Sequence, residues 1–163
     1  MTRILVCYHS RTGTTERMAR EIAQGMRESG ADVDLLSVEQ VDTDALTEYQ
    51  GIVLGSPTYY GLPSAELKAL IDESVKHHGK LEWKVGGAFT SSANPAGGNE
   101  TTVMAILESL LVHGMIVKGD PRDDHYGPVV IGEADEEDLK RCRDYGRRIA
   151  ELTQGVEKWI SKK

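Results

Sequence analysis

The stretch ILVCYHSRTGTTERMA, residues 4–19, joins an apolar run, a polar loop and the start of a helix. Ile4 to Cys7 has no polar alternation, which is typical of a strand buried on both faces of a parallel sheet. The segment that follows carries Met18, Ile22 and Met26 at a spacing of four, as one face of a helix does. The sequence therefore predicts a strand, a loop and a helix in direct succession.

The loop between them, Ser10 to Thr15, is hydroxyl or glycine at five of its six positions. A helix N-terminus has free N–H groups and a partial positive charge, and hydroxyls beside it add hydrogen bonds to an oxyanion. The pattern is neither a Walker loop nor the GxGxxG dinucleotide fingerprint. It predicts a phosphate site made of neutral donors, although a plain N-cap with surplus threonines is an equal alternative.

Four more short apolar runs follow, at residues 33–36, 52–54, 85–89 and 115–117. Segments with helical spacing separate most of them, and a last helix follows the acidic turn 135–138. Between the second and third runs there is room for only a turn or two of helix, at 42–46. The order predicts an α/β fold, a doubly wound five-stranded parallel sheet with helices on both faces. An irregular stretch, 118–127, reads as an insertion before the β-like residues 129–131, and residues 1–163 as a single domain.

Composition narrows the classes of function. The formal charge of −7 argues against a nucleic-acid partner, because phosphate backbones need a basic surface. No apolar run approaches the length of a membrane span and none resembles a signal peptide, so we expect a cytoplasmic protein. The two cysteines, Cys7 and Cys142, and the five histidines lack metal-ligand spacing, so no metal is expected and both cysteines read as small buried hydrophobes.

In a doubly wound sheet, ligands bind at the carboxyl ends of the strands. The loop after the third strand, 55–63, places Tyr59 and Tyr60 between Pro57 and Gly61, where exposed rings favour stacking on another flat ring. The loop after the fourth strand, 90–99, is small and polar, which suits hydrogen bonds to a planar polar ligand. The alternatives are tyrosines packed as a lid on the protein itself and a flexible connection without a ligand. Taken together, the three loops fit a molecule with a phosphate at one end and a flat heteroaromatic ring at the other, as in FMN.

The chain resembles the flavodoxin-like superfamily and, within it, the WrbA-type NAD(P)H:quinone oxidoreductases. The resemblance runs nearly end to end. It rests on residues 8–19, on GSPTYYGLPSAELKALID (55–72), on FTSSANPAGGNETTV (89–103), on LLVHGMIV (110–117) and on Tyr126-Gly127. The chain departs from the WrbA type by lacking a long insertion between the second and third strands. In addition, Trp83 does not fall on the position of a tryptophan that lines the substrate site in that type. These departures leave quinone selectivity and tetrameric assembly open.

The resemblance implies roles for individual residues. The cofactor-binding set is Ser10, Arg11, Thr12, Gly13, Thr14 and Thr15 at the phosphate, Pro57, Thr58, Tyr59, Tyr60 and Gly61 beside the isoalloxazine, and Ser91, Ser92, Ala93, Asn94, Gly97 and Gly98 at its edge and ribityl chain. It also implies a catalytic position near the flavin for His113. From the residues alone, a histidine just before Gly114 equally reads as a favourable charge at a helix C-terminus.

The resulting hypothesis is an FMN-dependent oxidoreductase that transfers electrons from NAD(P)H to a quinone-like acceptor. A flavodoxin-type single-electron carrier that serves redox-partner proteins is the alternative, and a module that has lost its cofactor is a third. A homo-oligomer, either a dimer or a tetramer, is expected with the first hypothesis.

Overall fold

The computed structural model describes all 163 residues, and its centre is one parallel sheet. Its strands are β1 (Arg3–Tyr8), β2 (Asp32–Ser37), β3 (Gly51–Pro57), β4 (Val85–Ser92), β5 (Ile116–Val117) and β6 (Val129–Ile131). The order across the sheet is β2-β1-β3-β4-β5, with β6 also paired to β4, and every pair is parallel. This confirms the predicted α/β doubly wound sheet. The strand order reverses between β1 and β3, so the loops after these strands flank the point where such folds bind ligands.

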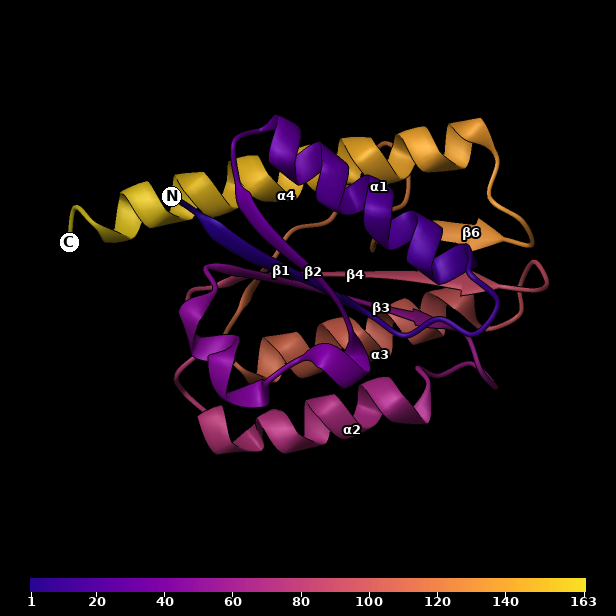
Figure 1. Cartoon of the computed structure of the whole chain (residues 1–163), viewed down its shortest axis with the longest axis horizontal. Coiled ribbons are helices and arrows are strands. Elements are labelled where there is room, and N and C mark those ends of the chain that lie inside the picture. The colour runs from indigo at the N-terminus through magenta and orange to yellow at the C-terminus, as the bar shows by residue number, and fades with distance from the viewer.

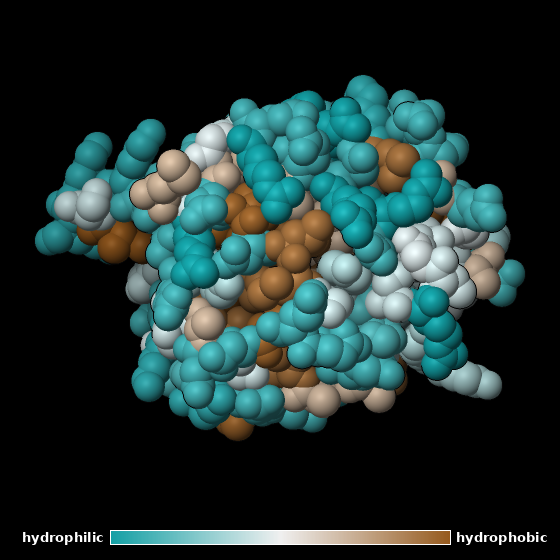
Figure 2. Space-filling view, viewed as in Figure 1, coloured by the Kyte–Doolittle hydropathy of each residue, from teal (hydrophilic) through white to brown (hydrophobic).

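Helices cover both faces of the sheet, which Figure 1 shows nearly edge-on. The helices are α1 (Thr14–Glu28), α2 (Ala65–Glu73), α3 (Asn99–Val112) and α4 (Glu136–Ile160), with 3₁₀ turns η1 (Val38–Gln40), η2 (Thr43–Glu48) and η3 (Ser74–His77). One buried cluster joins α1 and α4 to the sheet, and a second joins α2 and α3 to its other face. In Figure 2 the helical surfaces are mostly polar, and an apolar strip lies between the two layers.

The fifth position of the sheet is divided between two short strands. Because β3 occupies one side of β4 along its length, β5 and β6 share the other side, at Val85–Gly86 and at Thr90–Ser92. The chain between them is the predicted insertion. The middle of β4 is left without a strand partner there, and Ala88 N–H instead donates to the Tyr145 hydroxyl of α4 over 3.1 Å. Gly127 lies against the same residue, since a Cβ atom on it would sit 2.0 Å from the Ala88 carbonyl oxygen.

None of the helices combines the length and the apolar character that crossing a membrane requires.

Candidate functional site

The first loop ends at the N-terminus of α1, where several backbone N–H groups have no acceptor within the chain. Gly13 is the N-cap with φ of 104°, and no side chain caps the helix. The N–H groups of Thr14, Thr15 and Glu16 make no hydrogen bond to the protein, while that of Gly13 is taken by Ser10 Oγ over 3.2 Å. Unpaired donors at a helix N-terminus form an anion site. These free donors lie at the position where the sequence predicts a phosphate site.

The second loop is a tight hairpin that projects an aromatic ring. Tyr59 and Leu62 exchange two backbone hydrogen bonds, of 2.9 and 3.1 Å, around Tyr60 and Gly61. Both central residues have positive φ, 50° and 75°, which is the pattern of a type I′ turn. An aromatic residue rarely adopts this conformation. The strained turn leaves the Tyr60 side chain fully exposed at the tip, so the ring covers nothing of the protein itself.

Gly61 in this hairpin touches the third loop directly. A Cβ atom on Gly98 would lie 2.4 Å from Gly61 Cα, so the two backbones approach as closely as only glycine permits. Thr101 Oγ1, in the first turn of α3, donates to the Gly61 carbonyl over 2.8 Å. The second and third loops are therefore held against each other at the carboxyl edge of the sheet.

Hydroxyls below the loop tips tie all three loops together. Thr15 Oγ1 and Ser91 Oγ lie 2.8 Å apart, and both are buried. Thr58 N–H donates to the Ser91 carbonyl over 2.7 Å. Thr90 Oγ1 donates to the Ser56 carbonyl, so Thr58 is the donor in the 2.9 Å pair that it forms with Thr90. These hydrogen bonds fix the spacing of the loops. We call the hydroxyls that form them, those of Thr15, Thr58, Thr90 and Ser91, the hydroxyl struts.

The remaining predicted positions lie at the same edge with different exposure. Pro57 is buried as the last residue of β3, Ser92 is buried at the end of β4, and its hydroxyl donates to the Asn94 carbonyl over 3.1 Å. Ala93, Asn94 and Gly97 form an exposed stretch. Thr12 is exposed and Thr14 is half-buried, and neither hydroxyl is used within the chain. All predicted cofactor-binding positions are thus brought to one edge.

Arg11 is the only charged side chain within residues 10–15, 55–63 and 90–99. It is exposed, and its guanidinium lies over the Tyr59 ring, with Cζ 5.2 Å from the ring centroid. Around the loops the surface is acidic, because the segments after β2 and β6 and the first turns of α2, α3 and α4 carry exposed carboxylates. They are Glu39, Glu66, Glu100, Glu133, Asp135, Glu136 and Glu137. A single cation therefore lies inside an acidic rim.

His113 is not brought to this edge. It is the C-cap residue of α3, and the adjoining Gly114 carbonyl accepts from Trp83 N–H just before β4 begins. β4 runs for eight residues from there to the third loop, a span of about 25 Å. The helices run against the strands, so the end of α3 lies at the amino edge of the sheet (Figure 1). Within one chain His113 therefore lies far from the three loops, and its predicted position near the flavin stays a prediction.

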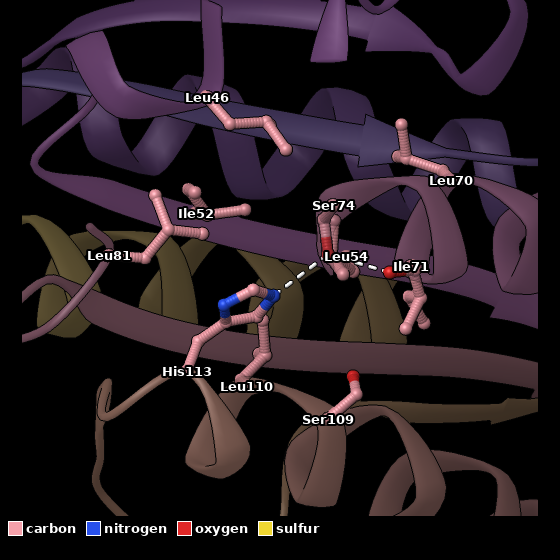
Figure 3. Close-up of a pocket in the computed structure, with 10 residues that line it drawn as sticks. All are labelled: Leu46, Ile52, Leu54, Leu70, Ile71, Ser74, Leu81, Ser109, Leu110 and His113. Carbon is pink, nitrogen blue, oxygen red and sulfur yellow. Dashed lines mark hydrogen bonds between the residues drawn. The ribbon is translucent and has the colours of Figure 1, made fainter. Parts of the chain in front are cut away.

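Mostly apolar side chains surround His113 and line a small cavity beside its ring (Figure 3). Ser74 Oγ donates to the Ile71 carbonyl over 2.6 Å, so in its 2.8 Å contact with His113 Nε2 the ring nitrogen is the donor. Burial, followed by the charges of His78 and His77, lowers the pKa of His113 below its usual value. The cavity beside the ring has a volume of about 30 Å³, room for a water molecule, whereas cofactor sites need several hundred.

Two hydroxyl residues that the sequence did not single out also shape the site. Ser56 is completely buried, and its Oγ accepts from Ser64 N–H over 2.8 Å, which closes the second loop onto the start of α2. Thr101, described above, anchors the hairpin tip. Thr101 could have been recognised from its place three residues after Gly98, where hydroxyls often bond a helix N-terminus. Nothing in the sequence distinguishes Ser56 from its neighbours.

The cysteines are inert, as predicted. Cys7 and Cys142 are buried and free, and desolvation raises the pKa of each thiol to about 12. Neither thiol forms a thiolate near neutral pH.

Comparison with known proteins agrees with this geometry. A doubly wound sheet with an anion cradle and an aromatic hairpin at its switch point defines a class of flavin- and nucleotide-binding proteins. The flavodoxin family model matches residues 6–111, and the chain belongs to this family. An NAD(P)H dehydrogenase (quinone) from Archaeoglobus fulgidus is 34% identical, with 94% of this chain and 98% of that protein covered. A flavodoxin from Clostridium saccharobutylicum is 39% identical, with 94% and 99% covered.

Among solved structures, a WrbA-like flavodoxin from Agrobacterium tumefaciens superposes with a TM-score of 0.82 at 29% identity, covering 96% of this chain and 99% of that one. These relatives confirm the resemblance drawn from the sequence, both to the superfamily and to its WrbA-type branch. Membership of the flavodoxin family implies that the chain binds a flavin. The donor set at α1 fits this implication, because uncharged N–H and hydroxyl groups are what the structure offers to a phosphate.

Proposed function

We propose that this protein binds FMN in the three loops and transfers electrons from NAD(P)H to a quinone-like acceptor. The observation that carries the proposal is the pairing of free N–H donors at the N-terminus of α1 with an exposed aromatic hairpin, on loops that hydroxyl struts hold at a fixed spacing. Bound FMN supplies the redox chemistry. The relatives named NAD(P)H dehydrogenase (quinone) support the choice of donor and acceptor.

The chain's own residues have separable tasks in this proposal. The N–H groups of Thr14, Thr15 and Glu16, with the Thr12 and Thr14 hydroxyls, bind the phosphate. Tyr59, Tyr60 and Gly61 flank the ring, and exposed backbone groups of residues 93–98 hydrogen-bond its polar edge. Within one chain His113 lies at the opposite edge of the sheet and contributes no group to these three loops.

The test is an absorbance titration. Purified protein is loaded with FMN, freed of excess flavin, and mixed anaerobically with NADPH or NADH, after which benzoquinone is added. We expect a bound-flavin spectrum, bleaching by the nicotinamide and re-oxidation by the quinone. FMN should also raise the unfolding temperature, because a ligand that binds only the folded state stabilises it. Protein that gains no stability and no colour from FMN would contradict the proposal and leave the cofactor-free module.

A single-electron carrier is the second candidate, and the acidic rim favours it. NAD(P)H is an anion that carboxylates around the loops repel, whereas a basic redox protein is attracted to them. The 39% identity to a flavodoxin over almost the whole chain supports the same candidate. A carrier would be reduced by dithionite but not by NAD(P)H. It would pass electrons to a basic protein such as cytochrome c at a rate that falls as salt is added.

A further inference from the structure

We propose that Trp83 and Trp159 form a binding site for a small organic cation of the trimethylammonium class, and that the Lys163 ammonium occupies this site as an internal ligand. These two residues are the only tryptophans of the chain. Trp83 lies two residues before β4 begins, so the site is at the amino edge of the sheet, opposite the three loops. The inference is therefore independent of the proposed function.

The two indole rings lie side by side at the surface. Their centroids are 5.3 Å apart with 54° between the ring planes, and the residues are 45% and 42% exposed. Trp159 belongs to the last turn of α4, which projects beyond the sheet (Figure 1). Two half-exposed indoles set at an angle offer their faces to a cation from two directions.

The backbone at Trp83 is strained. Its φ is 69°, in the left-handed region that a bulky residue rarely adopts. The Trp83 N–H donates to the Gly114 carbonyl over 3.2 Å, which ties this conformation to the end of α3. Such strain persists only where the surrounding structure imposes it, and it is concentrated at functional positions. The strained backbone places the Trp83 ring beside that of Trp159.

A cation of the chain itself already contacts both rings. Lys163 Nζ lies 3.7 Å from the centroid of the Trp159 ring and 5.2 Å from that of Trp83. Exposed lysines elsewhere pair with carboxylates, as Lys68 does with Asp72, whereas Lys163 has no ion pair. The two rings thus hold a positive charge without the help of a carboxylate.

A cavity of about 280 Å³ beside the Trp83 ring gives a ligand room. Trp83 lines it together with Glu82 and Glu157, whose carboxylates complement a positive charge. Lys84 lines it as well, but its ammonium donates to two backbone carbonyl groups and is engaged there. The volume limits the ligand to a small molecule.

The chemistry of the rings selects among cations. An indole has an N–H donor and no acceptor, so the rings cannot replace the water that a primary ammonium loses on contact. A trimethylammonium group has no N–H to satisfy, and aromatic cages bind it. A ligand of this class should therefore displace the Lys163 ammonium.

The test is an NMR titration of the whole chain with choline, which follows the two indole N–H resonances and the choline methyl protons. We expect both indole resonances to shift, and the methyl protons to move upfield because they enter the shielding region over the rings. The matched ligand is 3,3-dimethyl-1-butanol, in which carbon replaces the charged nitrogen. It should bind at least about ten-fold more weakly, because only the cation–π contribution is lost.

Three variants separate the rings from the internal ligand. Trp159→Leu should weaken choline binding by about five-fold or more, and Trp159→Phe should retain part of the affinity. Lys163→Gln should tighten binding by about three-fold or more, because it removes the competing ammonium. A gain in affinity cannot result from a variant that fails to fold.

Lys162→Gln is the matched control for the internal ligand. Lys162 is exposed and without an ion pair, and its substitution makes the same change in net charge as Lys163→Gln. It should alter the dissociation constant for choline by less than about two-fold, because an exposed charge away from the rings is screened by salt.

Equal dissociation constants for choline and its carbon isostere would overturn the inference, because the site would then be merely apolar. Indole resonances that stay in place at every choline concentration would overturn it as well. Equal effects of Lys163→Gln and Lys162→Gln would refute the internal ligand, since only the net charge of the chain would then matter. None of these results bears on flavin binding, so the proposed function is tested separately.

Discussion

The hydroxyl of Tyr145 offers a sharp test of how the divided sheet edge is held together. It accepts from Ala88 N–H over 3.1 Å in the middle of β4, where neither β5 nor β6 provides a partner. Ala88 is completely buried and Tyr145 nearly so. Tyr145→Phe removes the acceptor and changes little else, and it leaves a backbone donor without a partner in the core.

An unsatisfied buried donor costs about 1–3 kcal/mol, so we expect Tyr145→Phe to lower the free energy of unfolding by about 2 kcal/mol. For a chain of this size that corresponds to about 4–8 °C in Tm. The measurement is urea unfolding followed by far-UV circular dichroism, with an unchanged m-value as the sign that only stability has altered. Exchange of the Ala88 amide hydrogen should accelerate in the variant.

Tyr8→Phe is the control, because Tyr8 is half-buried and its hydroxyl makes no hydrogen bond within the chain. It should change stability by less than about 0.5 kcal/mol. If Tyr145→Phe behaves like Tyr8→Phe, and the Ala88 amide remains protected, then the β4 donor does not depend on this hydroxyl and the account of the divided edge is wrong.

Three further predictions follow from single positions. Gly127→Ala should lower the free energy of unfolding, measured with urea, by at least about 3 kcal/mol, because its Cβ would meet the Ala88 carbonyl and its φ is 137°. Gly132→Ala is the control: its φ is 73° and its Cβ would lie in open space, so it should cost only about 1–2 kcal/mol. The lowered pKa of folded His113 means that the unfolded chain binds the proton first. The stabilisation that depends on neutral His113 is therefore fully present above about pH 6.5, and the free energy of unfolding falls as the pH drops below that value. His113→Gln should show a shallower fall in unfolding titrations between about pH 7 and 5. An equal fall in the variant and the wild type would contradict the assignment. Thr15→Val should cost about 1 kcal/mol by leaving Ser91 Oγ without its partner, while Thr12→Val, on an exposed hydroxyl, should be silent in the same assay.

The fold was predictable because its signals are local and repeated. Ile4–Cys7 and the runs like it have no polar alternation, which is typical of strands covered on both faces, and most of them are followed by a helical spacing. Parallel strands joined by helices leave few topologies. Even the insertion was visible, since residues 118–127 break both periodicities. The sequence did not reveal that the interrupted edge would be completed by a tyrosine from α4, because that contact joins residues 57 positions apart.

His113 is a residue whose place in the fold the sequence motif did not predict. Its position at the end of a helix was recognised correctly, but the favourable charge inferred from that position does not agree with the structure, because burial lowers the pKa of His113. The catalytic role came from the resemblance, which does not record at which edge of the sheet the residue lies within one chain. Because helices in this fold run against the strands, the end of α3 and the carboxyl ends of the strands lie on opposite sides. Topology, once predicted, could have placed His113 without a structure.

The hydroxyls of the loops lead to a different conclusion about what the site residues do. The sequence assigns Thr15, Thr58 and Ser91 to the ligand, but the structure joins Thr15 to Ser91 and Thr58 to Thr90, so these groups are already engaged with one another. The donors left for a phosphate are backbone N–H groups, together with the exposed hydroxyls and Arg11. A loop whose hydroxyls are already held by one another loses little entropy when it binds a ligand. It follows that substitutions at the struts should act through stability and affinity together, whereas substitutions at Arg11 should change affinity alone.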